Sequence, residues 1–234
     1  MVSDMNSSVS YWLLQEYQAT GLGQDALPSA QLQAELRKLT ARWRRAFNKF
    51  AEWTASRFVD KVQLYSDQTL ESNIRAAVPG FEVRFNNIPR PMRDVLQASV
   101  HQNVSLIKSI SSQYLDEVEG MVMRSVMQGR DSGQLAKELR KRYNITQRRA
   151  EFIAFDQNNK ATSALQAARQ KSTGITRGIW KHSHAGKVPR PSHLKADGEE
   201  FDISKGMYLD GKWTMPGEEP NCRCTWHPII PGFE

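Results

Sequence analysis

Apolar side chains recur at helical spacing along most of the chain before Gly174. Within residues 31–66, a mostly aromatic stripe recurs at steps of three and four, made of Trp43, Phe47, Phe50, Thr54 and Phe58. Basic residues occupy another side of the same segment, as in an amphipathic helix. We therefore predict one long helix over 31–66. Its aromatic stripe is interpreted as core or as a subunit contact, not as a cofactor-binding site.

Two further regions repeat the helical period. Residues 92–128 predict a second long helix, with a stripe comprising Leu96, Val100, Val104, Ile107, Tyr114, Val118, Met121 and Ser125. The intervening segment 78–91 contains three prolines and a glycine, so it breaks any helix, and "FEVRF" within it is a candidate short strand. Residues 132–143 predict a short helix, and residues 146–171 a third long one with Thr146 as its capping residue.

The pattern changes after Gly174. Helical periodicity stops, prolines become frequent, and segments such as "GIW", "EEFDI", "MYLD" and "KWTM" predict small strands joined by turns. The expected fold class is therefore α+β, with a mostly helical N-terminal two-thirds built from long amphipathic helices and a small β-rich C-terminal module. We divide the chain into a helical docking or assembly region (1–130), a helical lead-in (131–173) and a β-rich module containing Cys and His (174–234).

Composition places the chain among globular proteins. Hydrophobic residues make up 39% and charged residues 24% of the sequence, so a packed core is expected. No segment approaches the roughly 18 uncharged apolar residues of a membrane span. The N-terminus also lacks the basic start of a signal peptide. We therefore expect no membrane span.

Charge is distributed unevenly. Residues 137–195 contain 14 Lys and Arg against three acids, a balance of +11, whereas residues 196–234 have a balance of −5. This asymmetry fits an acidic partner, either DNA or an acidic protein surface, although solvated helix faces are the alternative explanation. The candidate DNA contacts, independent of base sequence, are Arg140, Lys141, Arg142, Arg148, Arg149, Lys171 and Arg177. The candidate partner-binding residues on the first long helix are Arg42, Arg45 and Lys49.

The two cysteines of the chain lie one residue apart, at Cys222 and Cys224. A disulfide between them is disfavoured, because the α-carbons of an extended i, i+2 pair lie near the upper limit of disulfide geometry. An extended C-x-C does place both thiols on one face, where they could bind one zinc ion together with histidines. His182 and His193 are the preferred partners, and His184 and His227 are alternates. The other interpretation is that both cysteines are buried packing residues.

A catalytic interpretation has less support in the sequence. A Cys–His pair could act as a nucleophile with its base, and a His/Asn cluster could serve a metal-dependent nuclease. The chain carries no protease or transferase signature, and the acids of the tail show no recognisable metal-binding pattern. We assign no catalytic residue, and keep a metal-dependent nucleic-acid-processing enzyme as the alternative function.

The tail contains several elements in a fixed order. These are a Trp-x-His start (Trp180, His182), an Arg-Pro-x-His turn (Arg190, Pro191, His193), an Asp-Gly hairpin with a following aromatic (Asp197, Gly198, Phe201), a Pro-Gly pair (Pro216, Gly217) and "NCRC" (Asn221 to Cys224). In this order and spacing they resemble the C-terminal module of the phage Mu F-like minor head proteins, the phage head-morphogenesis family. With the preceding helix, the resemblance covers about residues 130–230.

This resemblance implies a minor capsid protein of a tailed phage, present in few copies. Its implied partners are the portal protein, major capsid or scaffold proteins, and packaged DNA bound non-specifically. The implied location is the virion, in the head interior or at the portal vertex, with host cytoplasm as the location during assembly. The matching residues His182, His193, Cys222 and Cys224 are implied to be architectural. We also expect the region after residue 130 to fold without the rest of the chain.

Overall fold

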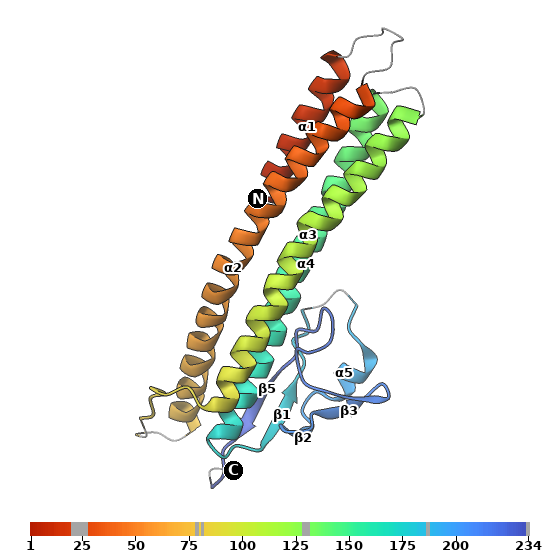
Figure 1. Ribbon diagram of the computed structural model, residues 1–234. Helices are drawn as coiled ribbons and strands as arrows, with labels where there is room; N and C mark the ends of the chain where they lie inside the picture. The colour runs from red at the N-terminus through yellow and green to blue at the C-terminus, as the bar shows by residue number, and fades with distance from the viewer. Residues whose placement is uncertain (20–27, 78–79, 81, 128–131, 186–187, 233–234) are drawn as a thin grey trace. The chain divides into compact units, whose positions relative to one another are not determined.

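A computed structural model describes the chain except residues 20–27, 78–79, 81, 128–131, 186–187 and 233–234 (Figure 1). Helices dominate up to residue 172, and short strands follow, which confirms the α+β fold class. The helices are α1 (Val2–Ala19), α2 (Pro28–Ala77), α3 (Arg90–Met127), α4 (Ser132–Ser172) and α5 (Pro191–Lys195). The strands are β1 (Arg177–Lys181), β2 (Glu200–Asp202), β3 (Met207–Leu209), β4 (Lys212–Thr214) and β5 (Thr225–Ile229).

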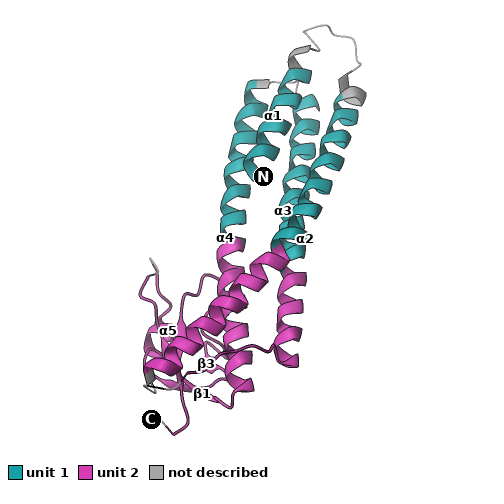
Figure 2. Cartoon of the chain, turned by 90° about the vertical axis from the view of Figure 1, so that its left-hand side faces the viewer, with its two compact units in different colours: residues 1–54, 103–153 teal, residues 55–102, 154–234 magenta. Residues whose placement is uncertain are grey.

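The chain forms two compact units, each built from two separate stretches of sequence (Figure 2). Unit 1 comprises Met1–Thr54 and Asn103–Ile153, and unit 2 comprises Ala55–Gln102 and Ala154–Glu234. Helices α2, α3 and α4 each contribute residues to both units. This division follows packing, whereas the boundaries expected at residues 130 and 173 follow composition and motifs and stay predictions.

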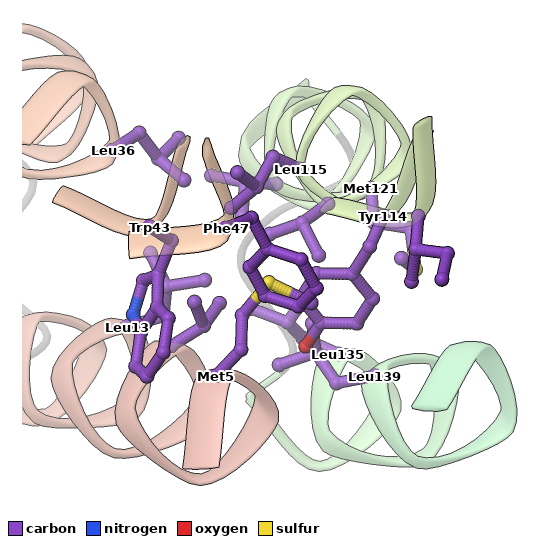
Figure 3. Close-up of a cluster of buried hydrophobic side chains, with 14 of the residues drawn as sticks. Met5, Leu13, Leu36, Trp43, Phe47, Tyr114, Leu115, Met121, Leu135 and Leu139 are labelled. Carbon is purple, nitrogen blue, oxygen red and sulfur yellow. The ribbon is translucent and has the colours of Figure 1, made fainter. Parts of the chain in front are cut away.

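Unit 1 is a helical unit with one hydrophobic core. Helix α1 buries Met5, Val9 and Leu13 completely, at steps of four residues that place them on one face. Phe47 of α2 and Tyr114 of α3 pack into the same cluster (Figure 3). Burial of each such side chain stabilises the fold by about 1.5–3 kcal/mol. The sequence analysis did not predict α1.

Unit 2 joins the other halves of the long helices to the C-terminal strands. Val62 of α2, Met92 of α3 and Leu165 of α4 form one buried cluster. A second cluster contains Leu70 and Ile74 of α2 together with apolar residues of the tail, among them Trp180, Phe201, Cys222, Cys224 and Trp226. The strands therefore share a core with helix α2, which ends 100 residues before the first strand begins.

The strands form two small antiparallel sheets. The three-stranded sheet has the order β2-β1-β5, with Ile179 opposite His227 and Trp180 opposite Trp226. Strands β3 and β4 form a hairpin. Its two connecting residues, Asp210 and Gly211, have φ values of 51° and 83°, and positive φ at both positions is typical of a type I′ turn.

Three predictions about element bounds are wrong. The helices expected at 132–143 and 146–171 are one helix, α4, and Thr146 is buried inside it instead of capping its start. The apolar stripe continues across the expected break, because Leu135, Leu139 and Ile153 belong to the same cluster. The helix expected at 31–66 spans Pro28–Ala77, since Leu70 and Ile74 prolong its buried face.

The third wrong bound is the strand expected at "FEVRF". Phe81 lies outside the described residues, and residues 82–85 have no regular secondary structure. The backbone N–H of Phe85 instead donates to Glu71 Oε1 at 2.9 Å, so this segment is held by a helix side chain and not by a partner strand. Among the helices of the described residues, none is both long and apolar enough to cross a membrane.

Candidate metal centre

The two cysteines precede strand β5 in a segment whose side chains alternate between core and solvent. Cys222 and Cys224 are 3% and 8% exposed, whereas Arg223 between them is exposed. This alternation is what an extended backbone gives, because successive side chains point to opposite faces. Both cysteines are free thiols, and both face the interior of unit 2.

His193 approaches the two thiols from the short helix α5. Pro191 occupies the first turn of that helix, where a missing backbone N–H costs nothing. The His193 side chain is buried, and its ring packs edge-on against Trp180 with 5.3 Å between ring centroids. Its Nδ1 atom lies 3.5 Å from the Sγ atom of each cysteine. The three ligand atoms all lie within 4.8 Å of one another, so this group could hold a metal ion.

The spacing of the group fits tetrahedral zinc. Zn–S bonds of about 2.3 Å and a Zn–N bond of about 2.0–2.1 Å at tetrahedral angles place each sulfur about 3.6 Å from the nitrogen. The separations of 3.5 Å between His193 Nδ1 and the two Sγ atoms agree with this value. One nitrogen and two sulfurs are also donor types that zinc prefers.

Helix α4 and a glycine turn hold the cysteine segment in place. Asn159 Nδ2 of α4 donates to the carbonyl oxygen of Cys222 at 2.8 Å. The backbone N–H of Gly217 points at Cys222 Sγ at 3.4 Å. Gly217 has a φ of 84°, and a side chain there would meet the Asn159 carbonyl oxygen at 3.3 Å. Glycine at this position therefore allows the turn to lie directly on the helix.

The electrostatics of the two thiols differ. A hydrogen bond from Cys224, together with backbone N–H groups including that of Gly217 and the nearby His193, lowers the pKa of Cys222. The same hydrogen bond and burial raise the pKa of Cys224. The pair therefore favours a single negative charge. A thiolate is the form of cysteine that binds metal.

The other histidines of the tail lie outside this three-residue group. The backbone N–H of His182 donates to Asp197 Oδ1 at 2.9 Å, and its Nδ1 accepts from the backbone N–H of His184 at 3.1 Å. His184 Nε2 lies 3.3 Å from Asp197 Oδ2. These contacts, led by the His182 N–H bond, lower the pKa of Asp197. His227 is exposed on β5. The structure thus brings together three of the four expected ligands.

The candidate DNA-binding residues divide into paired and exposed groups. Arg142 pairs with Glu117, Arg149 donates to Ser109 Oγ at 2.9 Å, and Arg177 pairs with Glu200. Arg177 is nevertheless exposed, as are the remaining four, namely Arg140, Lys141, Arg148 and Lys171. The candidate partner-binding residues on α2, Arg42, Arg45 and Lys49, are also exposed.

Sequence reasoning missed the residues that support the metal group. Asn159 lies on a helix more than 60 residues before the cysteines, and a hydrogen bond to a distant carbonyl leaves no periodic signal. Trp180 and Gly217 are part of the recognised motif, but their contacts with His193 and Cys222 emerge only from the fold. The Pro-Gly pair at Pro216 and Gly217 was the sequence signal that could have predicted the tight turn beside Cys222.

Comparison with known proteins relates part of the chain to one family. Residues 116–227 match the family model described as Phage Mu protein F like protein, and this range includes the whole candidate metal centre. An uncharacterized protein of Haemophilus influenzae (strain ATCC 51907 / DSM 11121 / KW20 / Rd) is 32% identical over 186 residues, which cover 79% of this chain and 40% of that protein. The chain therefore spans less than half the length of this relative. No solved structure matches the chain.

Proposed function

We propose that this chain, which matches the Phage Mu protein F-like family model over residues 116–227, is a minor capsid protein for head morphogenesis in a tailed phage. The observation that carries the proposal is the family match, which covers helix α4 and the strands as one region. The same match supports its proposed placement in the virion, in the head interior or at the portal vertex. The host cytoplasm is the proposed site of assembly.

The burial of the metal group supports an architectural role over an enzymatic one. His193, Cys222 and Cys224 are each less than a tenth exposed. A catalytic metal keeps a coordination position open to substrate and water, whereas a structural site is closed. A nucleic-acid-processing enzyme would need substrate to reach this group. The burial therefore favours a protein that assembles over one that catalyses.

Zinc is the proposed metal, held by Cys222, Cys224 and His193. The proposed fourth ligand comes from the segment around His182, and His182 is the residue that the sequence predicts for this role. In support, the backbone of Ser183, next to His182, is close enough to Cys224 to lower the pKa of its thiol, so this segment lies near the group. A structural zinc site would compensate for the small apolar core that a module of this size can bury.

The exposed face of α2 is the proposed contact with the portal or with capsid or scaffold proteins. Arg42, Arg45 and Lys49 are exposed on it. Phe50 and Trp53 follow them, with exposed fractions of 36% and 54%. Arginine and aromatic side chains are the commonest energetic centres of protein interfaces. This composition favours a partner surface that is acidic and carries apolar pockets.

Contact with packaged DNA is proposed for a second basic surface, on α4. Lys137, Arg140, Lys141 and Arg148 are exposed, and at 3.6 residues per turn they fall within about 100° of the helix circumference. Such a surface would bind phosphates without reading bases, and its affinity should fall steeply with salt. Equal binding to duplexes of unrelated sequence at low salt, lost at high salt, is the expected result.

The test of the proposed function is an inventory of phage particles by mass spectrometry. Procapsids, virions and emptied particles from a phage encoding this chain are compared. The protein is expected in procapsids and virions at a copy number far below that of the major capsid protein. Deletion of its gene should yield defective heads. Absence from all three particles, with normal heads after deletion, would overturn the proposal.

A further inference from the structure

Unit 2 contains a groove of about 620 Å³ that lies beside the cysteine segment. Helix α2 contributes Phe58, Lys61, Val62 and Tyr65, and helix α4 contributes Asn158, Asn159, Thr162, Ser163 and Gln166. The third wall is formed by Pro216 and residues 223–226. Neither the proposed zinc site nor the proposed capsid contacts assign a role to this groove.

The α4 wall has an unusual composition for a helix face. Its five lining residues follow helical spacing, and all five carry neutral amide or hydroxyl groups. A face that packs in a core is normally apolar, and a face in water is normally charged. Amide side chains both donate and accept hydrogen bonds, as peptide groups do. This wall is therefore suited to hydrogen-bonding another polypeptide backbone.

The charged residues that line the groove are basic and therefore favour an anionic ligand. Lys61 and Arg223 line it, and none of its described lining residues is acidic. The Arg223 guanidinium stacks on Phe155 at 4.7 Å and donates to the carbonyl oxygen of Ala185 at 3.1 Å, so its position is fixed. Lys61 is exposed, and no carboxylate among the described residues pairs with it.

The free edge of strand β5 lies next to this groove. In the sheet order β2-β1-β5, no strand of the described residues pairs with the far side of β5. Trp180 uses its backbone N–H and C=O toward the β2 side, bonding Glu199 and Gly198. In antiparallel pairing its partner Trp226 therefore points its own N–H and C=O away from β1. Thr225 and Trp226 both line the groove.

We propose that this groove binds an extended acidic segment of a partner protein, which adds as a strand to the edge of β5. The Trp226 peptide group and the α4 amides would bond the segment's backbone, and Lys61 and Arg223 would receive its carboxylates. Strand addition to an exposed sheet edge is an established mode of peptide recognition. The site lies in unit 2 and does not depend on the proposed role in phage heads.

The test uses the full chain and a short fluorescein-labelled peptide of alternating glutamate and threonine. In a strand, this alternation places every glutamate on one face. Binding is followed by fluorescence anisotropy, and hydrogen exchange at the Trp226 amide is measured with and without peptide. The acidic peptide is expected to bind at least about tenfold more tightly than its lysine counterpart, and the Trp226 amide should exchange more slowly. The acidic peptide N-methylated at alternate residues should not bind.

Two groove variants that are expected to fold normally test whether the peptide binds in this groove. Lys61→Glu removes a cation, and Gln166→Glu is isosteric and puts a carboxylate in the groove; each should weaken acidic-peptide binding about tenfold. Lys195→Glu, an exposed reversal in the same unit outside the groove, should leave it unchanged. Unchanged melting temperatures exclude unfolding as the cause.

Several results would overturn the proposal. One is the absence of acidic-peptide binding, and another is equal binding of the acidic and lysine peptides. Full binding by the N-methylated peptide would exclude strand addition. Preferential binding of an oligo-dT strand, weakened by Lys61→Glu, would assign the groove to nucleic acid. Self-association that protects the Trp226 amide without peptide would assign it to a second copy of this chain.

Discussion

Arg169 and Asp67 form a buried, two-point ion pair that joins α4 to α2 within unit 2. Arg169 Nε lies 2.6 Å from Asp67 Oδ1, and Nη2 lies 2.8 Å from Oδ2. The remaining guanidinium nitrogen, Nη1, donates to the Asn87 carbonyl oxygen at 2.9 Å, and the guanidinium lies over the Phe85 ring at 4.6 Å. One arginine thus fixes two helices and the connection between α2 and α3.

Removal of one partner should destabilise unit 2 strongly. Asp67→Ala leaves the buried Arg169 guanidinium without its counter-charge, and a broken buried pair typically costs about 3–5 kcal/mol. Urea unfolding monitored by tryptophan fluorescence measures the change in the free energy of unfolding. Arg44→Ala is the control, because its pair with Asp116 is exposed and should contribute at most about 1 kcal/mol. Similar losses in both variants would contradict the role of burial.

Alkaline pH should destabilise unit 1 through Tyr114. Burial raises the pKa of Tyr114 above its usual 10.0, and the charge of Arg142 opposes this only partly. Above about pH 10 the unfolded chain loses this phenolic proton while the folded chain keeps it. The folded state then binds more protons, so stability falls as pH rises. Thermal unfolding measured from neutral pH to above pH 10 tests this prediction.

Tyr114→Phe is the matched variant for this titration. At neutral pH it should cost about 0.5–1.5 kcal/mol, because the hydroxyl hydrogen bond to Asn6 Oδ1 is lost. At alkaline pH the variant should lose less stability than the natural chain, since the ionising group is absent. Parallel pH profiles for the two proteins would show that Tyr114 does not carry the effect.

Protein purified without chelator should contain about one zinc per chain. Structural zinc typically contributes on the order of 10 kcal/mol of apparent binding free energy, part of which stabilises the fold. Elemental analysis should find zinc in the natural chain and in His227→Ala, whose histidine is exposed and outside the group. Cys222→Ser and His193→Ala should lack it and melt earlier. Metal-free protein with an undiminished melting temperature would instead support packed, inert cysteines.

Charge reversal on α2 should weaken incorporation into heads without unfolding the protein. Arg42, Arg45 and Lys49 are exposed, and exposed substitutions rarely change stability by more than about 0.5 kcal/mol each. Replacement of all three by Glu is compared with reversal of two exposed tail residues, Lys195 and Lys205. Quantitative mass spectrometry of purified heads gives the copy number. Equal incorporation of both variants would exclude this face of α2 as the docking surface.

Local sequence pattern was sufficient to locate the three long helices α2, α3 and α4, though not α1, and part of the metal group. Helical periodicity is a property of neighbouring residues, so the long helices could be predicted without knowledge of their partners. The C-x-C spacing likewise placed both thiols on one side of an extended segment. The predicted bounds of α4 were wrong, because threonine is a common capping residue and the local sequence suggested a helix start at Thr146. In the structure Thr146 is buried and the helix continues through it.

Contacts between distant segments could not be predicted in the same way. Asp67 and Arg169 are 102 residues apart, and nothing local to either indicates the other. The sequence also predicts an independent module after residue 130. Independent folding of this region stays a prediction, but Leu70 and Ile74 of α2 belong to the same buried cluster as Trp180, and this contribution from an earlier helix could not be foreseen from the sequence. A single sequence carries no signal for such pairings.

The interleaving of the two units also constrains how a gene for this chain could recombine. Unit 1 uses residues 1–54 and 103–153, and unit 2 uses the two remaining stretches. Consider a single crossover in the coding sequence between residues 55 and 153. Each unit of the resulting protein then contains segments from both parents. Exchange of unit 1 as a matched whole would require three junctions, near codons 54, 102 and 153. A hybrid with one junction inside this interval mixes core side chains from two parents in both units, whereas a junction outside it mixes only one unit, so viable mosaics should have their breakpoints outside this interval.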